Sequence, residues 1–295
     1  MAAAVKIAVI GADGQLGSDI VAACRADGHE VVPLTIAQLD ITDEAQVRQA
    51  VAAGGAGVIV NTAAMHQVEK CEANPARAFA VNALGVRHVA LAAAAAGALL
   101  VHVSTDYVFD GAKAAPYLES DCPLPLNAYG NSKLAGELFV RSLAAKHWVL
   151  RVSGLFGCNP CLEKAGGLNF VDLMLKLSRE RREVRVVDDE ILTPTSTREV
   201  SRQLLHLLRR GAEDGLYHVT AEGECSWYEF AREIFRLSGS AIELNKAAPG
   251  EFPMKVPRPK YSVLENACLK RQGLNVMRPW QEALAEYLRE KHGIH

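Results

Sequence analysis

A short apolar run followed at once by three spaced glycines is the feature that most constrains how this chain can fold. Residues 5–10 read Val-Lys-Ile-Ala-Val-Ile, which is typical of a strand buried on both faces of a sheet. Gly11, Gly14 and Gly17 come next and open a helix-like stretch. In this order Gly11 makes a tight turn, Gly14 lets a pyrophosphate approach the backbone, and Gly17 lets helix and strand pack closely. The sequence therefore predicts a dinucleotide-binding turn.

The start of this first helix supplies two further candidate contacts. Gln15 and Leu16 lie between Gly14 and Gly17, where the first backbone amides of a helix can donate to phosphate oxygens. We therefore count Gln15 and Leu16, together with the glycines, as cofactor-binding residues.

Strand-like and helix-like segments alternate along the first half of the chain. Apolar runs at residues 29–34, 58–60, 99–103 and 147–152 each read as strands, with helical patterns between them. This alternation predicts an α/β fold with a Rossmann-type, doubly wound parallel sheet, whose ligand lies at the carboxyl ends of the strands. With 295 residues and 49% hydrophobic content, the chain can also bury the core of an additional lobe.

The pattern changes after residue 153, where a loop rich in glycine and cysteine begins. We predict that residues 1–155 form a dinucleotide-binding Rossmann domain, and that residues 184–210 return to it with a strand at residues 184–188 and a helix. Residues 156–183 and 211–295 are then expected to form a smaller C-terminal substrate-binding lobe.

Composition and charge argue against several other classes of protein. The net charge of −2, with acidic and basic residues interspersed, gives no basic face for nucleic acid or a membrane surface. The longest apolar run, residues 91–103, is interrupted by Gly97 and is shorter than the ~20 residues that cross a bilayer. The N-terminus has no secretory pattern, so we expect a cytoplasmic protein.

Seven cysteines at irregular spacing fit reduced thiols better than a disulfide framework. Cys158 and Cys161 form the one suggestive pair, which could be half of a zinc site or a redox dithiol. Because no second such pair or histidine pair lies near them in the sequence, we interpret their spacing as incidental and predict no metal site.

Cofactor preference is predicted from the end of the second strand, where the adenosine ribose would lie. An NAD-selective site usually has Asp or Glu there, whereas residues 35–37 are Thr, Ile and Ala. This favours NADPH, or use of both NADP and NAD, although no arginine is at hand to bind a 2′-phosphate. Asp40 and Ile41 would suit the adenine pocket; Thr42 as the N-cap of a helix is the alternative reading.

Small residues end the strand at residues 58–60. Asn61 is followed by Ala63 and Ala64, which leave room for a cofactor lying across the strand ends. We include these three residues in the predicted cofactor site.

Tyr129 and Lys133 are the candidate reacting groups. They are four residues apart, so a helix would place the phenol and the ammonium on one face. Ser104 and Thr105 end a buried strand upstream and would bring a hydroxyl to the same edge of the sheet. A core tyrosine beside a solvated lysine is the alternative reading of this common spacing.

Several segments together resemble the extended short-chain dehydrogenase/reductases and, more finely, the dTDP-4-dehydrorhamnose reductase family. The resemblance runs from about residue 5 to the C-terminal helix. Its motifs are the glycines at 11, 14 and 17, Asn-Thr-Ala-Ala at 61–64, Ser-Thr-Asp-Tyr-Val-Phe-Asp-Gly at 104–111, Tyr-Gly-Asn-Ser-Lys-Leu-Ala-Gly-Glu at 129–137, Gly-Leu-Tyr-His at 215–218 and Arg-Pro at 258–259.

This resemblance implies hydride transfer from NADPH or NADH to the C4 carbonyl of a nucleotide-linked 4-keto-6-deoxy sugar. Tyr129 would donate the proton, with a pKa lowered by the nearby Lys133 cation, and Lys133 would also hold the nicotinamide ribose. Thr105 would hold the substrate carbonyl. The remaining residues expected to contact substrate are Ser104, Tyr107, Gly154 and Arg258. A homodimer is a further expectation.

Two departures from the family pattern leave the substrate open. Gly154 stands where rhamnose-forming members usually have tryptophan, and Met65 followed by His66 replaces the usual histidine or tyrosine. A different 4-keto sugar is one reading. Others are an NADP-binding regulatory subunit, resembling the β subunit of methionine adenosyltransferase, and an epimerase of the same superfamily.

Overall fold

A six-stranded parallel sheet forms the base of the molecule. The computed structural model describes residues 4–162, 165–248, 250–252 and 255–294. The strand order is β2-β1-β3-β4-β5-β10, and each neighbouring pair is parallel. The predicted Rossmann-type sheet is thus confirmed. Its strands are β1 (Lys6–Ile10), β2 (Glu30–Leu34), β3 (Val58–Asn61), β4 (Leu99–Thr105), β5 (His147–Val152) and β10 (Gly215–His218).

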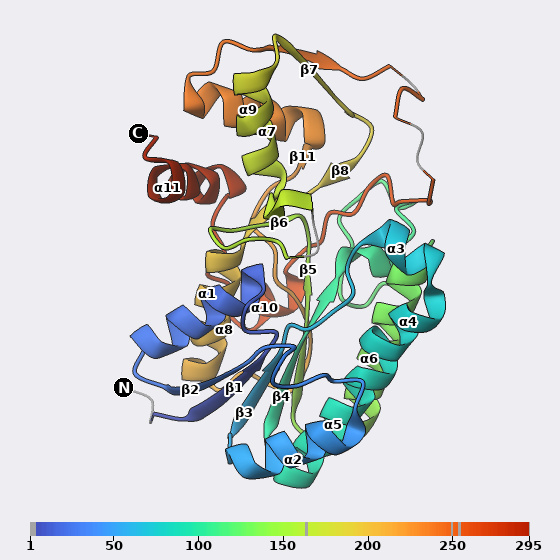
Figure 1. The fold of residues 1–295 in the computed structure, drawn as a ribbon, viewed down its shortest axis with the longest axis vertical. Coiled ribbons are helices and arrows are strands. Elements are labelled where there is room, and N and C mark those ends of the chain that lie inside the picture. Colours follow the sequence, from blue (N-terminus) through green and yellow to red (C-terminus); the bar gives the residue numbers. More distant parts are fainter. Residues whose placement is uncertain (1–3, 163–164, 249, 253–254, 295) are drawn as a thin grey trace.

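Helices cover both faces of this sheet (Figure 1). The side chains of β1 alternate between them: Ile7 and Val9 join one core cluster, and Ala8 and Ile10 join the other. Burial on both faces explains why the strand is apolar at consecutive positions. One face carries α1 (Gln15–Ala26), α8 (Thr197–Arg210) and α10 (Ala267–Arg271); the other carries α2 (Glu44–Gly54), α5 (Val86–Ala96) and α6 (Ala128–Leu143).

A long helical stretch precedes β4. It comprises α3 (Val68–Ala73), α4 (Pro75–Phe79), a π-helical turn η1 (Ala80–Gly85) and α5, and it ends at Gly97 in the left-handed conformation. By length and composition alone, Pro75–Ala96 could cross a membrane, but half of its most apolar window is buried inside the structure. Val86, Val89 and Ala93 belong to the core cluster beneath the sheet, so this stretch packs as a core helix.

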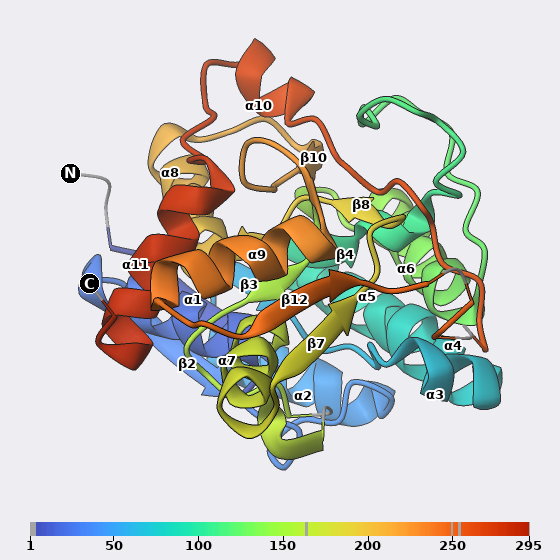
Figure 2. The same cartoon turned by 90° about the horizontal axis from the view of Figure 1, so that it is seen from above.

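A smaller lobe lies above the carboxyl edge of the sheet (Figures 1 and 2). Its core joins aromatic and aliphatic side chains from three helices, including Phe230 and Trp280. The helices are α7 (Phe170–Glu180), α9 (Trp227–Ser238) and α11 (Trp280–His292). Three short strand pairs accompany them: β6 (Leu155–Phe156) with β9 (Thr195–Ser196), β7 (Glu183–Val186) with β12 (Glu243–Lys246), and β8 (Ile191–Leu192) with β11 (Cys225–Ser226).

One predicted strand has a different partner from the expected one. The strand at residues 184–188 was expected in the main sheet, which is wrong: β7 pairs with β12 in the lobe. The edge strand of the main sheet is instead β10, from a segment assigned to the lobe. In β7 buried valines alternate with charged residues, which fits a half-exposed pair better than a strand covered on both faces. The helix α8 does pack on α1, against the sheet.

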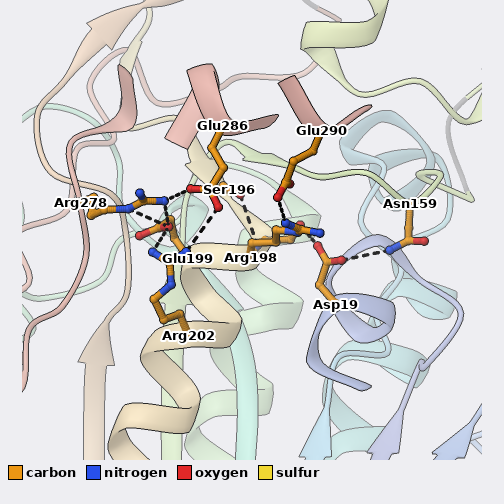
Figure 3. Close-up of polar contacts among 10 residues, drawn as sticks. Asp19, Asn159, Ser196, Arg198, Glu199, Arg202, Arg278, Glu286 and Glu290 are labelled. Carbon is orange, nitrogen blue, oxygen red and sulfur yellow. Dashed lines mark hydrogen bonds and ion pairs between the residues drawn. The ribbon is translucent and has the colours of Figure 1, made fainter. Parts of the chain in front are cut away.

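Charged side chains join α8 to α11 and α1 (Figure 3). The buried carboxylate of Glu199 accepts hydrogen bonds from Arg202 at 2.7 Å and Arg278 at 2.6 Å. Asp19 of α1 accepts one from Asn159 at 3.1 Å and one from Thr197. These contacts fix the lobe against the helical layer of the sheet.

Candidate active site

The glycine turn after β1 has no room for side chains. Gly11 has φ +78°, and an added Cβ would lie 2.7 Å from Thr62 Oγ1 and 2.9 Å from the Ala63 nitrogen. An added Cβ on Gly17 would lie 2.1 Å from the Gly11 carbonyl oxygen. Thr62 completes the packing by donating to the Ile10 carbonyl at 2.8 Å. Only glycine therefore permits the helix to begin this close to β1 and β3.

The first turn of α1 fits a pyrophosphate. Gly14 is its N-cap, no side chain of the described residues caps it, and its first turn holds no acidic residue. Its leading amides are then available to an anion, which the positive end of a helix favours. The Gln15 side chain turns away and donates to Gly157 and Asn159 carbonyls at 3.4 and 3.2 Å. Leu16 is buried in the core, so both could reach a cofactor through backbone amides alone.

The region predicted for adenosine is only partly open. Ile41 is 2% exposed and packs in the core. Its side chain therefore supports this region from beneath and does not line an open pocket. Asp40 accepts hydrogen bonds from the backbone and hydroxyl of Thr42 at 2.9 and 2.8 Å, which lower its pKa. The alternative reading of Thr42 as a helix cap is wrong, because Asp43 caps α2.

Asn61 lies in the interior beneath the cofactor edge. It is fully buried, it contacts His102 Nδ1 at 3.4 Å, and its Oδ1 accepts from the Ala63 amide at 3.2 Å. It therefore shapes the turn in which Ala63 and Ala64 are half-buried. The backbone of Ala63, rather than the Asn61 side chain, adjoins Gly11 of the glycine turn.

The candidate reacting groups start α6. Asn127 caps this helix by accepting from the Gly130 amide at 2.9 Å, and Tyr129 and Lys133 follow within its first turns. Lys133 is 3% exposed. Its ammonium donates to the Val103 carbonyl at 2.7 Å, which directs it to the end of β4.

Thr105 and Tyr129 meet at this strand end. Thr105 acts on the Tyr129 phenol as a hydrogen-bonding neighbour that lowers its pKa, and the Tyr107 ring packs edge-on to the Tyr129 ring with 5.7 Å between centroids. Thr105 Oγ1 also accepts from the Tyr107 amide at 3.2 Å and donates to Asp106 Oδ1 at 3.0 Å. The structure therefore brings together three of the residues that the sequence singles out.

The acidity of the two groups departs from the expectation. Burial raises the pKa of Tyr129, and its hydrogen bond with Thr105 opposes the rise. The predicted direction, a pKa lowered by Lys133, is therefore wrong, because desolvation of the phenolate outweighs the nearby cation. Burial also lowers the pKa of Lys133 to about 8, against the attraction of Glu137. At neutral pH the phenol is protonated, as a proton donor must be.

A buried ion pair lies directly beneath these groups. Glu137 and Arg151 are each 1% exposed, and Arg151 donates twice to the carboxylate, at 2.9 and 2.7 Å. Ser104 is buried too, and its hydroxyl donates to Glu137 at 2.5 Å. The prediction that Ser104 contacts substrate does not match this placement, because its hydroxyl points into the domain. Ser104 instead fixes the end of β4.

The residues predicted to face substrate lie between the sheet edge and the lobe. Arg258 forms an ion pair with Glu69, and the Arg258 charge also acts on Tyr107 and Glu190. Glu190 accepts from Trp227 Nε1 at 3.2 Å, and burial raises its pKa. Arg258 and Glu190 thus lie near Tyr107, whose ring packs on Tyr129.

Gly154 adopts φ +51° just beyond β5. An added Cβ would lie 2.7 Å from Leu192 Cδ1 and 3.1 Å from the Thr193 carbonyl oxygen. A tryptophan at this position would therefore require Leu192 to move. The surface at residue 154 therefore differs in shape from one that carries an indole there.

The described residues contain no group of three or more His, Cys, Asp or Glu side chains that could hold a metal ion. Cys161 lies 3.4 Å from His66 Nε2, which links the loop after β6 to the segment after β3. Sequence reasoning assigned no role to this contact.

The sequence assigned no role to four residues of the site, namely Asp106 and Glu137, which lie within the quoted motifs, and Arg151 and Glu190. A charged residue inside the apolar strand at residues 147–152 was the available signal for Arg151, because a charge buried on both faces needs a partner. Asp106 and Glu190 had no comparable signal, since their partners come from distant segments.

The sheet, the glycine turn and the Thr105, Tyr129 and Lys133 set define a Rossmann-type protein of the short-chain dehydrogenase/reductase class. Residues 5–292 match the model of the RmlD substrate binding domain family. The chain belongs to this family.

Three relatives illustrate the likeness. The spore coat polysaccharide biosynthesis protein SpsK of Bacillus subtilis is 38% identical, over 97% of this chain and 98% of that protein. A dTDP-4-keto-6-deoxy-D-glucose reductase of Streptomyces niveus is 38% identical over 94% of each chain. The crystal structure of a dTDP-4-dehydrorhamnose reductase of Bacillus anthracis, in complex with NADP, is 36% identical, with a TM-score of 0.91 over 98% of this chain and 100% of that one.

Proposed function

We propose that this chain is an NAD(P)H-dependent reductase of a nucleotide-linked 4-keto-6-deoxy sugar, with dTDP-4-dehydrorhamnose as substrate and dTDP-L-rhamnose as product. The observation that carries the proposal is the convergence of Thr105, Tyr129 and Lys133 at the end of β4, on the same edge of the sheet as the glycine turn. Relatives of similar length, named as reductases of dTDP-linked keto sugars, support the choice of substrate.

In this proposal the glycine turn and the α1 amides hold the pyrophosphate, and Lys133 binds the nicotinamide ribose. NADPH supplies the hydride when bound, and NADH is the second candidate. NADPH is favoured because residues 35–37 present no carboxylate to a 2′-phosphate. The structure of a relative with NADP supports the same choice.

Tyr129 is proposed to give its proton to the carbonyl oxygen as negative charge develops there. An alkoxide left in a partly dry site would be costly, so proton delivery must accompany hydride addition. Thr105 would hold the carbonyl in line with the phenol, while Tyr107 and Arg258 would position the sugar nucleotide.

A different 4-keto sugar is the second candidate. It is favoured by Gly154, whose surroundings leave no space for a larger side chain, and by the relative named for dTDP-4-keto-6-deoxy-D-glucose. Leu192 would then contact the sugar where other members present tryptophan.

The test is consumption of NADPH or NADH with dTDP-4-dehydrorhamnose and with related 4-keto sugar nucleotides. Tyr129→Phe should lower kcat by about 10²- to 10⁴-fold and leave cofactor affinity nearly unchanged. Unchanged turnover in this variant would remove Tyr129 from the mechanism. Silence of the wild-type protein with every sugar would favour a binding role, such as a regulatory subunit. The predicted homodimer is tested in parallel by light scattering.

A further inference from the structure

Asp106 is a buried carboxyl group held by hydroxyls. It is 4% exposed and follows Thr105 directly, at the start of the short 3-10 helix η2 (Asp106–Val108). Its Oδ1 accepts from Thr105 at 3.0 Å and its Oδ2 accepts from Ser153 at 2.9 Å. Ser262 is a further hydrogen-bonding neighbour that lowers the pKa of Asp106. Glu137, by contrast, is held by a guanidinium.

The Thr105 hydroxyl has one hydrogen and two lone pairs to share among three neighbours. The Tyr107 amide always uses one lone pair, because it can only donate. When Asp106 is ionised, the Thr105 hydrogen points to the carboxylate. The phenol hydrogen of Tyr129 then fills the second lone pair, and it points at Thr105 instead of at substrate.

Protonation of Asp106 reverses the direction of these hydrogen bonds. The carboxylic acid donates its hydrogen to the second lone pair of Thr105, and the Thr105 hydrogen turns to the Tyr129 oxygen. The phenol hydrogen is then free to point at a carbonyl oxygen. After transfer, the proton is on the product oxygen, the phenolate is held by the Thr105 hydrogen, and Asp106 keeps its own proton.

We propose that Asp106 is a positioning residue whose proton sets the direction of the hydrogen bond between Thr105 and Tyr129, and that the protonated form is the one competent for proton delivery. This inference rests on the proposed reductase function only for its kinetic readout.

Burial supports the proposal by raising the pKa of Asp106, against the hydrogen bonds of Ser262, Ser153 and Thr105. The other titratable groups around it are Tyr107 and Tyr129, on whose pKa values the Asp106 charge acts. Arg258 and Glu190 act on Tyr107 from the lobe side.

The first test needs no substrate. In wild-type protein labelled with ¹³Cζ-tyrosine, the Tyr129 signal, assigned with Tyr129→Phe, should shift in one step as Asp106 loses its proton. Asp106→Asn should abolish this step. Ser153→Ala removes a donor to the charged form and should move the step about one pH unit higher, and Ser262→Ala should act likewise. Absence of a step in the wild type, or an unmoved step in both serine variants, overturns the proposal.

The second test uses the pH dependence of kcat/KM with dTDP-4-dehydrorhamnose and NADPH. Activity should fall with rising pH across the same step, and Asp106→Asn should lose that limb. Ser142→Ala, which removes a hydroxyl bonded to Phe139 on the exposed side of α6, is the matched control and should change nothing. An inactive wild type would contradict the proposed function while the tyrosine signal still decides the role of Asp106. A falling limb that persists in Asp106→Asn at the pH of the tyrosine step would contradict the positioning role.

Discussion

Replacing Arg151 by methionine removes the guanidinium that neutralises Glu137 beneath the active site. Methionine fills much of the same volume, so the main loss is charge and hydrogen bonding. Both partners are 1% exposed, and two hydrogen bonds join them. Breaking a buried pair by removing one partner costs about 3–5 kcal/mol, because the remaining charge is uncompensated. Ser104 still donates to Glu137, which keeps the expected cost near the lower value.

The assay is thermal unfolding followed by circular dichroism at pH 7. For 295 residues, an unfolding entropy of about 0.6 kcal/mol/K converts a loss of about 3 kcal/mol into a Tm lower by roughly 5 °C. Arg151→Met with Glu137→Met should recover part of this loss, because no buried charge then remains.

Arg209→Met is the matched control. Arg209 also forms a two-bond pair with a carboxylate, that of Asp27, but its side chain is 52% exposed. Water compensates both charges there, so the cost should stay within about 1 kcal/mol. If Arg151→Met lowers Tm no more than Arg209→Met does, burial is not what makes the Glu137 pair important.

Two further predictions concern the residues of the site. Burial lowers the pKa of Lys133 to about 8, so at pH 7 the residue carries a charge that the folded state disfavours. The free energy of unfolding of the wild type should therefore rise between pH 8 and ~10.4, the pKa of a lysine in the unfolded chain. Lys133→Met should therefore stabilise the fold by about 1–3 kcal/mol at pH 7 while abolishing reductase activity. Urea unfolding should show that this gain in stability is smaller at pH 10. An equal gain at both pH values would contradict the titration of Lys133. Gly11→Ala should lower the free energy of unfolding by at least about 2 kcal/mol, because Gly11 has φ +78° and an added methyl group would collide with Thr62. The same variant should bind NADPH more weakly in calorimetry. Gly54→Ala, in α2 with open space around the added methyl among the described residues, should instead gain about 0.5 kcal/mol, and similar behaviour of the two variants would contradict the role of the turn.

The parts of the fold that could be predicted from the sequence depend on local patterns. The β1 run, the glycines at 11, 14 and 17, and the capping box that starts α9 at Ser226 each specify their structure within a few residues. The partner of β7 was not predictable in this way, because alternation in residues 183–186 shows a half-exposed strand without identifying its neighbour.

The residues of the site likewise divide into those set by local sequence and those set by distant contacts. The spacing of Tyr129 and Lys133 is a property of one helix, and Thr105 ends one strand. The pKa of Tyr129 depends on how completely the surrounding chain excludes water, and the distant neighbours of Asp106 come from the residue after β5 and from the segment before α10. Ser104 was misjudged because its direction depends on Glu137, a contact made only after α6 packs on β4.

The position of β10 at the edge of the sheet affects how this protein folds during translation. Translation completes β5 at residue 152, but its outer neighbour emerges only at residues 215–218, after α7 and the first strands of the lobe. The helix α8, which covers one face of the sheet, is also translated in that interval. A nascent chain stalled between these points exposes an unpaired parallel edge and an uncovered apolar face, both of which favour aggregation. The six-stranded sheet therefore cannot be completed until α7 and the first strands of the lobe have been translated.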